Sequence, residues 1–217
     1  MLRSMRFRDR ADAGRQLGRR LADRDLEAPV VLALPRGGVP IGFEVAAALD
    51  APLDVLVVRK LGVPGHPELG MGAIGEDGVR LINPAIVRVT GVTEDQIAIV
   101  ERRERAELDR RAGRYRGDRS RLDLSGRTAV IVDDGLATGF TARAACELAR
   151  RRGADRVVVA APVASADALM GLAESADDVI CLQTPRAFRA IGQFYDDFTQ
   201  TTDIEVTGLL SRAGMRG

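Results

Sequence analysis

Two adjacent carboxylates follow an apolar run in the stretch VIVDDGLATGFTARAA, which spans residues 130–145. These residues, Asp133 and Asp134, are costly to bury while ionised unless they meet a charged or hydrogen-bonding partner. Backbone N–H groups at the start of a helix carry partial positive charge and point outward, so the loop that follows is typical of a phosphate cradle that needs no lysine. Its glycines and threonines are Gly135, Thr138, Gly139 and Thr141.

A phosphate would be repelled by the two carboxylates unless they face another part of the same ligand. A sugar diol or a bound metal ion would satisfy them. Ribose 5-phosphate fits both ends, with its phosphate in the glycine and threonine loop and its hydroxyls on Asp133 and Asp134. The alternative is a helix-capping turn with two solvated acids. A cap rarely needs both acids, which favours the ribose phosphate site.

The elements that would hold this loop are apolar strands alternating with helices. Continuous apolar runs predict strands at about residues 30–34, 54–60, 127–134, 156–163 and 177–185. Helical patterns are found at about residues 39–50, 94–117 and 139–153. This alternation predicts an α/β fold with a doubly wound, mainly parallel sheet of about five strands. Such sheets bind ligands beyond the carboxyl ends of their strands.

Four other segments have readable patterns. Residues 7–25 predict an amphipathic covering helix. Residues 61–78, rich in glycine and proline, predict a long loop with a hairpin turn at EDG, residues 76–78. The GMGAIG within it (70–75) spells a dinucleotide fingerprint, but we reject that reading because no strand precedes it and no helix follows. TDIE (202–205) predicts a capping box that opens a last helix.

The composition indicates one globular unit near charge neutrality. The 217 residues are 46% hydrophobic and 29% charged, which suits a single domain with a packed core. The formal charge of +1 offers no global attraction to nucleic acid or to an anionic membrane, so any anion site must be local. The amino terminus lacks the apolar segment of a signal peptide, and no stretch is long and apolar enough to span a bilayer. We therefore expect a soluble, cytoplasmic protein.

The stretch VIVDDGLATGFT resembles the signature of the type I phosphoribosyltransferases, an apolar strand and two acidic residues followed by a loop closing on T-G-x-T. ALPRGGVPIG (33–42) occupies the place of that family's pyrophosphate loop, which often contains a strained peptide bond. VVRKLG (57–62) resembles the segment that leads into its mobile catalytic loop. The resemblance implies one domain over residues 1–217, with a core at about 29–185, a mobile loop at about 61–78 and a small hood at about 186–217.

The same resemblance implies an activity and a set of site residues. The reaction would transfer ribose 5-phosphate from phosphoribosyl pyrophosphate to a nitrogenous base, with Mg²⁺, and release pyrophosphate. The ribose 5-phosphate contacts would be Asp133, Asp134, Gly135, Leu136, Ala137, Thr138, Gly139 and Thr141. The pyrophosphate contacts would be Arg36, Gly37, Gly38, Arg59 and Lys60. Catalysis would involve Asp133, Asp134, Lys60 and His66, with Glu68 as a further candidate. Mg²⁺ would be held mainly by the substrate, with Asp133 and Asp134 as candidate protein ligands.

The acceptor base is not identified by these patterns. Some purine salvage members carry an acidic residue three places after the acidic pair, where this chain has Ala137, which argues against close kinship with the hypoxanthine-type enzymes. Aromatic residues in the tail could stack a flat base or fill a hydrophobic seam. They are Phe188, Phe194, Tyr195 and Phe198.

Two other functions stay open. One is a regulatory or sensing protein that keeps the phosphoribosyl pyrophosphate site and controls binding to nucleic acid or a protein. An arginine-rich face on residues 102–116 leaves room for it, although the charge balance does not favour nucleic acid. The other is a synthase-like or hydrolytic relative that uses ribose phosphate donors without a free base. A homodimer is compatible with all of them.

Overall fold

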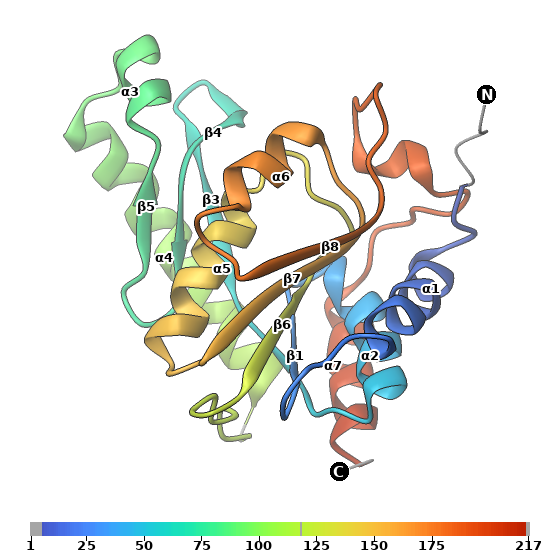
Figure 1. Cartoon of the computed structure of the whole chain (residues 1–217). Helices are drawn as coiled ribbons and strands as arrows, with labels where there is room; N and C mark the ends of the chain where they lie inside the picture. Colours follow the sequence, from blue (N-terminus) through green and yellow to red (C-terminus); the bar gives the residue numbers. More distant parts are fainter. Residues whose placement is uncertain (1–5, 118, 216–217) are drawn as a thin grey trace.

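The computed structural model describes residues 6–117 and 119–215 (Figure 1). The ends of the expected 1–217 domain, residues 1–5 and 216–217, and position 118 lie outside the described residues. Within the described part, no helix combines the length and the apolar character needed to cross a membrane.

A parallel sheet of five strands forms the centre of the protein, in the order β2-β1-β6-β7-β8. This confirms the predicted α/β class. Its strands are β1 (Val30–Ala33), β2 (Leu53–Val55), β6 (Thr128–Val132), β7 (Arg156–Val163) and β8 (Asp178–Gln183). The strands of the middle of the sheet are buried on both faces, as their continuous apolar sequences predict.

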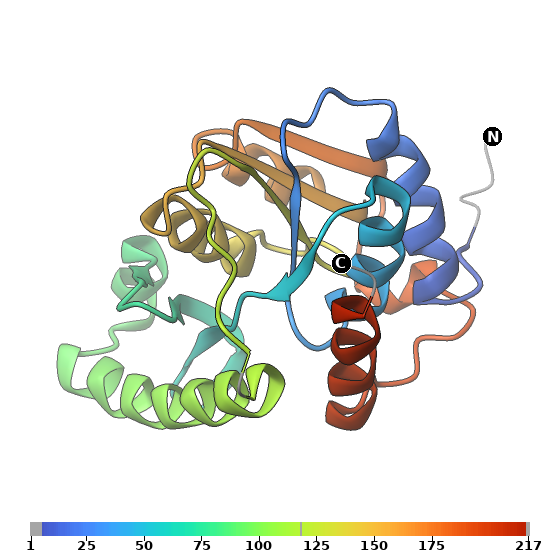
Figure 2. The same ribbon diagram turned by 90° about the horizontal axis from the view of Figure 1, so that it is seen from below.

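Helices cover both faces of this sheet (Figure 2). One face is covered by α1 (Arg10–Ala22), α2 (Gly38–Leu49) and α7 (Asp203–Gly214). The other face is covered by α5 (Phe140–Arg151) and α6 (Ala166–Leu172). Alternate residues of each strand therefore enter two separate hydrophobic cores.

The first and last helices begin where short polar side chains cap them. Asp9 accepts a hydrogen bond from the backbone N–H of Asp12 at 2.7 Å, so α1 begins at Arg10. The sequence prediction of a helix from Phe7 was wrong in this detail, because Phe7 instead forms a parallel bridge with Tyr195 of the tail. Thr202 caps α7 by accepting the Glu205 backbone N–H at 3.1 Å, which is one of the two hydrogen bonds of the capping box predicted at TDIE.

A second, antiparallel sheet corrects two predictions. Its strands are β3 (Val58–Val63), β4 (His66–Gly75) and β5 (Arg80–Ile82). The single strand predicted at 54–60 is in fact β2 and β3, because the apolar run continues while the chain crosses from one sheet to the other. The loop predicted at 61–78 is a β-hairpin followed by the expected turn at EDG. GMGAIG lies within β4 and not at the start of a helix, which agrees with the rejection of a dinucleotide-binding site there.

The small sheet lies between α5 and a long helix, α4 (Glu94–Arg116), and α3 (Pro84–Thr90) connects β5 to α4 (Figures 1 and 2). Its glycines permit close strand pairing, since a Cβ at Gly72 would lie 2.4 Å from the carbonyl oxygen of Leu81. A sequence with few β-branched residues and many glycines does not signal strands locally, which explains why the sequence pattern predicts a loop.

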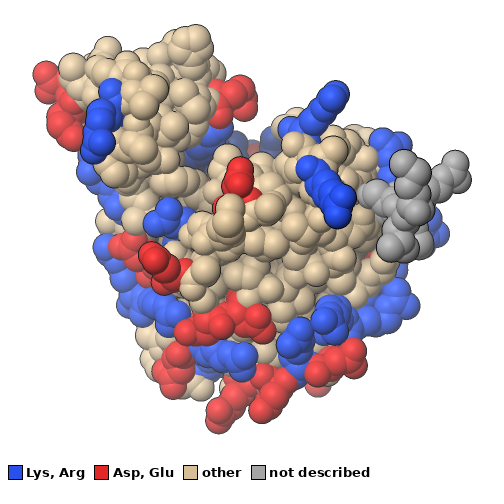
Figure 3. Space-filling view, turned by 45° about the horizontal axis from the view of Figure 1, so that its top comes forward, with Lys and Arg blue, Asp and Glu red and all other residues tan. Residues whose placement is uncertain are grey.

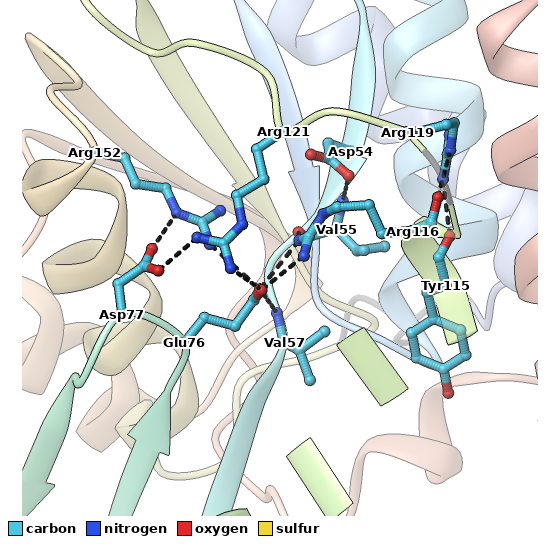
Figure 4. A network of polar contacts seen from close by, with 10 residues as sticks. All are labelled: Asp54, Val55, Val57, Glu76, Asp77, Tyr115, Arg116, Arg119, Arg121 and Arg152. Carbon is cyan, nitrogen blue, oxygen red and sulfur yellow. Dashed lines mark hydrogen bonds and ion pairs between the residues drawn. The ribbon is translucent and has the colours of Figure 1, made fainter. Parts of the chain in front are cut away.

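The turn between β4 and β5 is tied to the rest of the protein by a buried ion network centred on Glu76 (Figure 4). Its carboxylate, with the residue 4% exposed, lies 2.7 Å from Arg116, 3.0 Å from Arg121 and 3.4 Å from Arg152. Burial alone would raise the pKa of Glu76, but the hydrogen bond and charge of Arg116 hold that pKa below its usual value. The network therefore joins the hairpin base to the ends of α4 and α5.

Removing this carboxylate should destabilise the protein strongly. We expect Glu76→Ala to lower the free energy of unfolding by about 3 kcal/mol, because it leaves the buried guanidinium of Arg116 without its ion-pair partner, while Arg121 and Arg152 keep Asp77. Tm should fall by on the order of 10 °C. Calorimetric unfolding measures the effect. The control is Glu94→Ala, whose side chain is 82% exposed and pairs with Arg80 at 3.5 Å, and which should change stability by less than about 0.5 kcal/mol. Equal effects of the two substitutions would contradict the role given to Glu76.

Candidate active site

Two loops meet at the carboxyl edge of the parallel sheet because β1 and β6 are hydrogen-bonded neighbours. The loop after β1 carries Gly37 and Gly38, and the loop after β6 is the signature loop, residues 133–141. A Cβ at Gly37 would lie 1.9 Å from Asp134 Oδ2, and one at Gly38 would lie 2.5 Å from the carbonyl oxygen of Val132. Glycine is therefore required at both positions. The structure brings together these two predicted segments.

The signature loop is anchored to the strand and helix that follow it. Leu136 pairs with Ala164 in a short parallel bridge, and the Ser165 hydroxyl donates to the carbonyl oxygen of Ala137 at 2.6 Å. Gly139, at φ 72°, precedes α5 and makes no side-chain cap. The first-turn N–H groups of α5 are thus available to an anion, as the sequence predicts for a phosphate cradle.

The two carboxylates occupy different surroundings. Asp134 accepts hydrogen bonds from Arg10, whose Nε and Nη2 both lie 2.9 Å from its Oδ2. Asp133 accepts the backbone N–H of Asp134 at 2.8 Å through Oδ1. Burial raises the pKa of Asp133 well above its usual value, and the charge of Asp134 raises it further. Burial also raises the pKa of Asp134, against the opposing charge of Arg10.

Arg36 stands at the turn between β1 and α2, where the Pro35–Arg36 peptide bond is cis. Its Nη1 lies 3.8 Å from Asp203 Oδ1 at the start of α7. Asp203 also accepts the Tyr115 hydroxyl at 2.6 Å, and burial together with this hydrogen bond raises the pKa of Tyr115 to about 12. The guanidinium of Arg36 is therefore at the edge of the site, held toward α7.

The other predicted basic residues lie on the hairpin. Arg59 Nη2 lies 2.6 Å from Glu104 of α4, while Lys60 donates to the carbonyl oxygen of Glu68. Arg59 and Lys60 therefore have different partners, one on α4 and one within the hairpin. His66 is exposed at the start of β4. Within the described ranges, no hydrogen bond or ion pair joins these hairpin residues to the signature loop.

A pocket of about 530 Å³ lies between this hairpin and α4. Arg59 and Lys60 border it together with Val100, Arg103 and Glu104 of α4. No residue of the signature loop contributes to its lining. The pocket is thus a feature of the hairpin, separate from the edge where the two glycine-containing loops meet.

The tail packs on the signature loop. The Tyr195 hydroxyl donates to the carbonyl oxygen of Asp134 at 2.7 Å, and its ring centroid lies 5.4 Å from that of Phe7 and 5.0 Å from that of Phe198. Phe194 and Tyr195 are only 4% and 2% exposed. For these two residues the structure supports the hydrophobic seam rather than the base clamp.

Arg10 is the site residue that the sequence analysis missed. It lies on a helix that the pattern correctly describes as amphipathic, among many arginines of that segment. No spacing marks it out, because its partners, Asp134 and the carbonyl oxygen of Thr199, are more than a hundred residues away in the chain. Only the packing of α1 against the tail reveals it.

The donor set suits a cation held largely by its ligand. The described residues contain no group of three or more His, Cys, Asp or Glu side chains that could hold a metal ion. Mg²⁺ at phosphate-binding sites is commonly bound through one or two carboxylates together with substrate phosphates and water. Asp133, with one oxygen left over, fits that pattern.

Comparisons with known proteins agree with this geometry. The model of the phosphoribosyl transferase domain matches residues 10–199. The chain belongs to the phosphoribosyltransferase family. The TT1426 protein from Thermus thermophilus, for which there is a crystal structure, is 45% identical in sequence to this chain. The two structures have a TM-score of 0.81, and the match covers 96% of this chain and 99% of TT1426. The AQ2163 protein from Aquifex aeolicus, at 14% identity and a TM-score of 0.53, shares the fold.

Curated relatives of this phosphoribosyltransferase family member occur in two strains of Mycobacterium tuberculosis. They carry the provisional name phosphoribosyl transferase and are 58% identical over 207 residues, which is 95% of this chain. The chain spans about half (47%) of the length of these relatives.

The raised pKa of Asp133 gives a prediction about stability. The folded protein holds this proton more tightly than the unfolded chain, so stability falls as the pH rises from the unfolded pKa through the folded one. Asparagine mimics the protonated acid and avoids that loss. We expect Asp133→Asn to raise Tm relative to the wild type at about pH 8 by on the order of 2–4 °C, and the gap to narrow toward about pH 4.

Scanning calorimetry of both proteins at the two pH values measures this difference. The matched control is Asp155→Asn, an exposed carboxylate just before β7, at the opposite edge of the sheet, which should show no such gap. If Asp133→Asn lowers Tm, or if the difference in Tm does not depend on pH, the charge of Asp133 does not destabilise the folded protein.

Proposed function

We propose that this chain catalyses the transfer of ribose 5-phosphate from phosphoribosyl pyrophosphate to a nitrogenous base, with release of pyrophosphate. The observation that carries the proposal is the close approach of the Gly37–Gly38 turn to Asp134 at the start of the signature loop. A ligand with a phosphate, hydroxyls and a second anionic group spans these neighbouring features. Family membership supports the reaction type.

In this proposal, separate segments of the chain bind separate parts of phosphoribosyl pyrophosphate. The loop from Gly135 to Thr141 and the start of α5 would bind the 5-phosphate through backbone N–H groups. The turn at Arg36 and Gly37 would bind the pyrophosphate through its own backbone N–H groups and the Arg36 side chain, since the Gly38 and Val39 N–H groups already donate to backbone carbonyl oxygens. The acidic pair would lie beside the ribose and stabilise the positive charge that develops at the anomeric carbon. Mg²⁺, when bound, would neutralise charge on the diphosphate.

The hairpin from residue 58 to residue 75 is the proposed mobile element. Residues His66 to Leu69, which follow the turn at its tip, are exposed. Closure over the donor would exclude water that could hydrolyse it. In this proposal Arg59, Lys60 and His66 reach the ligand only in the closed arrangement, since the present structure directs Arg59 to Glu104 and Lys60 to Glu68.

The regulatory alternative receives less support. In the face shown in Figure 3, Lys and Arg side chains alternate with Asp and Glu rather than forming a patch of one sign. The arginine-rich part of α4 is largely neutralised by its own acids: Glu104 pairs with Arg103, and Glu107 pairs with Arg110 and Arg111. A nucleic-acid interface normally presents unpaired basic groups.

We retain a cytoplasmic location and a homodimer as parts of the proposal.

Calorimetric titration with phosphoribosyl pyrophosphate and Mg²⁺ tests the donor site. We expect the wild type to bind and Asp133→Asn to bind on the order of 10–100-fold more weakly, the effect of losing a hydrogen bond to a charged group. Asp155→Asn, again the matched control, should bind like the wild type. A folded wild type that does not bind this donor would rule out the proposed reaction.

Pyrophosphate release, measured with and without a panel of purine and pyrimidine bases, separates transfer from hydrolysis. Release that depends on a base supports transfer and identifies the acceptor class. Equal release without any base would instead favour the hydrolytic relative.

A further inference from the structure

Asp134 is engaged by protein groups from separate segments. Arg10 of α1 contacts its Oδ2 through two nitrogens at 2.9 Å, and Tyr195 of the tail donates to its carbonyl oxygen at 2.7 Å. Gly37 lies so close that a Cβ there would be 1.9 Å from the same Oδ2. The Asp134 carboxylate therefore lies at the junction of α1, the tail and the β1 loop.

Arg10 is itself held in place. Its Nη1 donates to the carbonyl oxygen of Thr199 at 2.7 Å, and its guanidinium carbon lies 3.9 Å from the ring centroid of Phe198. The side chains of Arg10 and Asp134 are only 11% and 13% exposed. An ion pair with this burial and these additional partners is fixed, unlike an exposed surface pair.

Asp133 differs from its neighbour. Its Oδ1 accepts the Asp134 N–H, and its second oxygen makes no hydrogen bond or ion pair within the described part of the chain. Each carboxylate thus has one oxygen bonded within the described part of the chain, Oδ1 of Asp133 and Oδ2 of Asp134. The difference between them is charge, because Asp134 is paired with the Arg10 guanidinium and Asp133 forms no ion pair there. Asp133 is therefore the acid whose charge is left for a ligand.

We propose that Arg10 is a positioning residue, which holds Asp134 in the protein framework and leaves Asp133 as the carboxylate that meets the ribose hydroxyls. This inference rests on the proposed function. Two uncompensated carboxylates beside a phosphate cradle would oppose the binding of an anion. The guanidinium of Arg10 cancels one of these charges and keeps the Asp134 carboxylate turned to α1 and the tail.

A double-mutant cycle with ribose 5-phosphate as the probe tests the role of Arg10 by calorimetry. We expect Arg10→Gln to raise Kd on the order of tenfold, because it leaves the Asp134 charge buried and unpaired. The Arg10→Gln, Asp134→Asn double variant removes that charge as well and should return to within about threefold of the wild type. Arg10→Lys keeps the positive charge and should retain most of the affinity.

If the role of Arg10 is only structural, the affinities of the variants should follow a different order. If Arg10 only ties α1 to the tail through Thr199 and Phe198, the double variant will bind at least as weakly as Arg10→Gln alone. That result would overturn the inference. Arg10→Lys also provides a folded comparison should Arg10→Gln be too unstable to measure.

A second measurement tests whether Asp133, rather than Asp134, meets the ribose. It compares the affinities for ribose 5-phosphate and for inorganic phosphate. Asp133→Asn should reduce the preference for ribose 5-phosphate on the order of tenfold, the loss of a charge-assisted hydrogen bond, and Asp134→Asn should largely keep it. The reverse order would show that Asp134 meets the sugar and would overturn the assignment.

Thermal unfolding of the same variants without ligand separates this inference from the proposed function. Arg10→Gln should lower Tm, and adding Asp134→Asn should recover part of the loss. Strictly additive effects would overturn the pairing whatever the protein binds. A coupled pair in a wild type that binds neither ribose 5-phosphate nor phosphoribosyl pyrophosphate would instead reject the proposed function, and with it the assignment of Asp133 to ribose.

Discussion

The contact between the Gly37–Gly38 turn and the end of β6 is the constraint on which the candidate site depends. It exists because β1 and β6 pair in parallel at the centre of the sheet, so their carboxyl ends emerge side by side. The starts of α2 and α5 follow directly, and neither has a side-chain cap. The start of α5 offers backbone N–H groups at this edge, whereas in α2 Gly38 and Val39 already donate to Leu34 and Arg36, and Pro40 has no N–H. A chain with a formal charge of only +1 can thereby build a local site for a polyanionic ligand.

Features of the site encoded in short stretches could be predicted from the sequence. The strand, the acidic pair, the glycine loop and α5 follow one another in fewer than thirty residues, and each leaves a local mark. The turn after β1 is marked in the same way by Pro35 and its glycines. Arg10 leaves no such mark, because its function arises from packing across the fold. The hairpin was missed for a related reason: its strands are stabilised by partners on α4 and α5, which override a sequence poor in β-forming residues.

The small sheet combines a fixed base with an exposed tip. At the base, Glu76 and Asp77 bind arginines from α4, α5 and the loop after α4, as Figure 4 shows. In β4, residues 71–75 are buried whereas residues 66–69 are exposed. Local opening is easiest where few buried contacts must be broken. Motion of the hairpin should therefore be concentrated near His66, while the junction between the two sheets stays in place.

The aromatic residues of the tail are mostly engaged in packing, and the family match does not identify the acceptor base. Tyr195 and Phe194 are buried in packing with the amino-terminal segment and Phe188, and Arg10 covers a face of Phe198. A flat base could stack on Tyr195, or on the face of Phe198 that Arg10 covers, only by displacing contacts that hold Asp134 and Arg10. In the proposed reaction, base recognition therefore does not use the buried rings of Phe194 and Tyr195, whereas Phe188, which packs on Phe194, is only half-buried. In this proposal the signature encodes the donor site and does not specify the acceptor site, so members of the family can share the first without sharing the second.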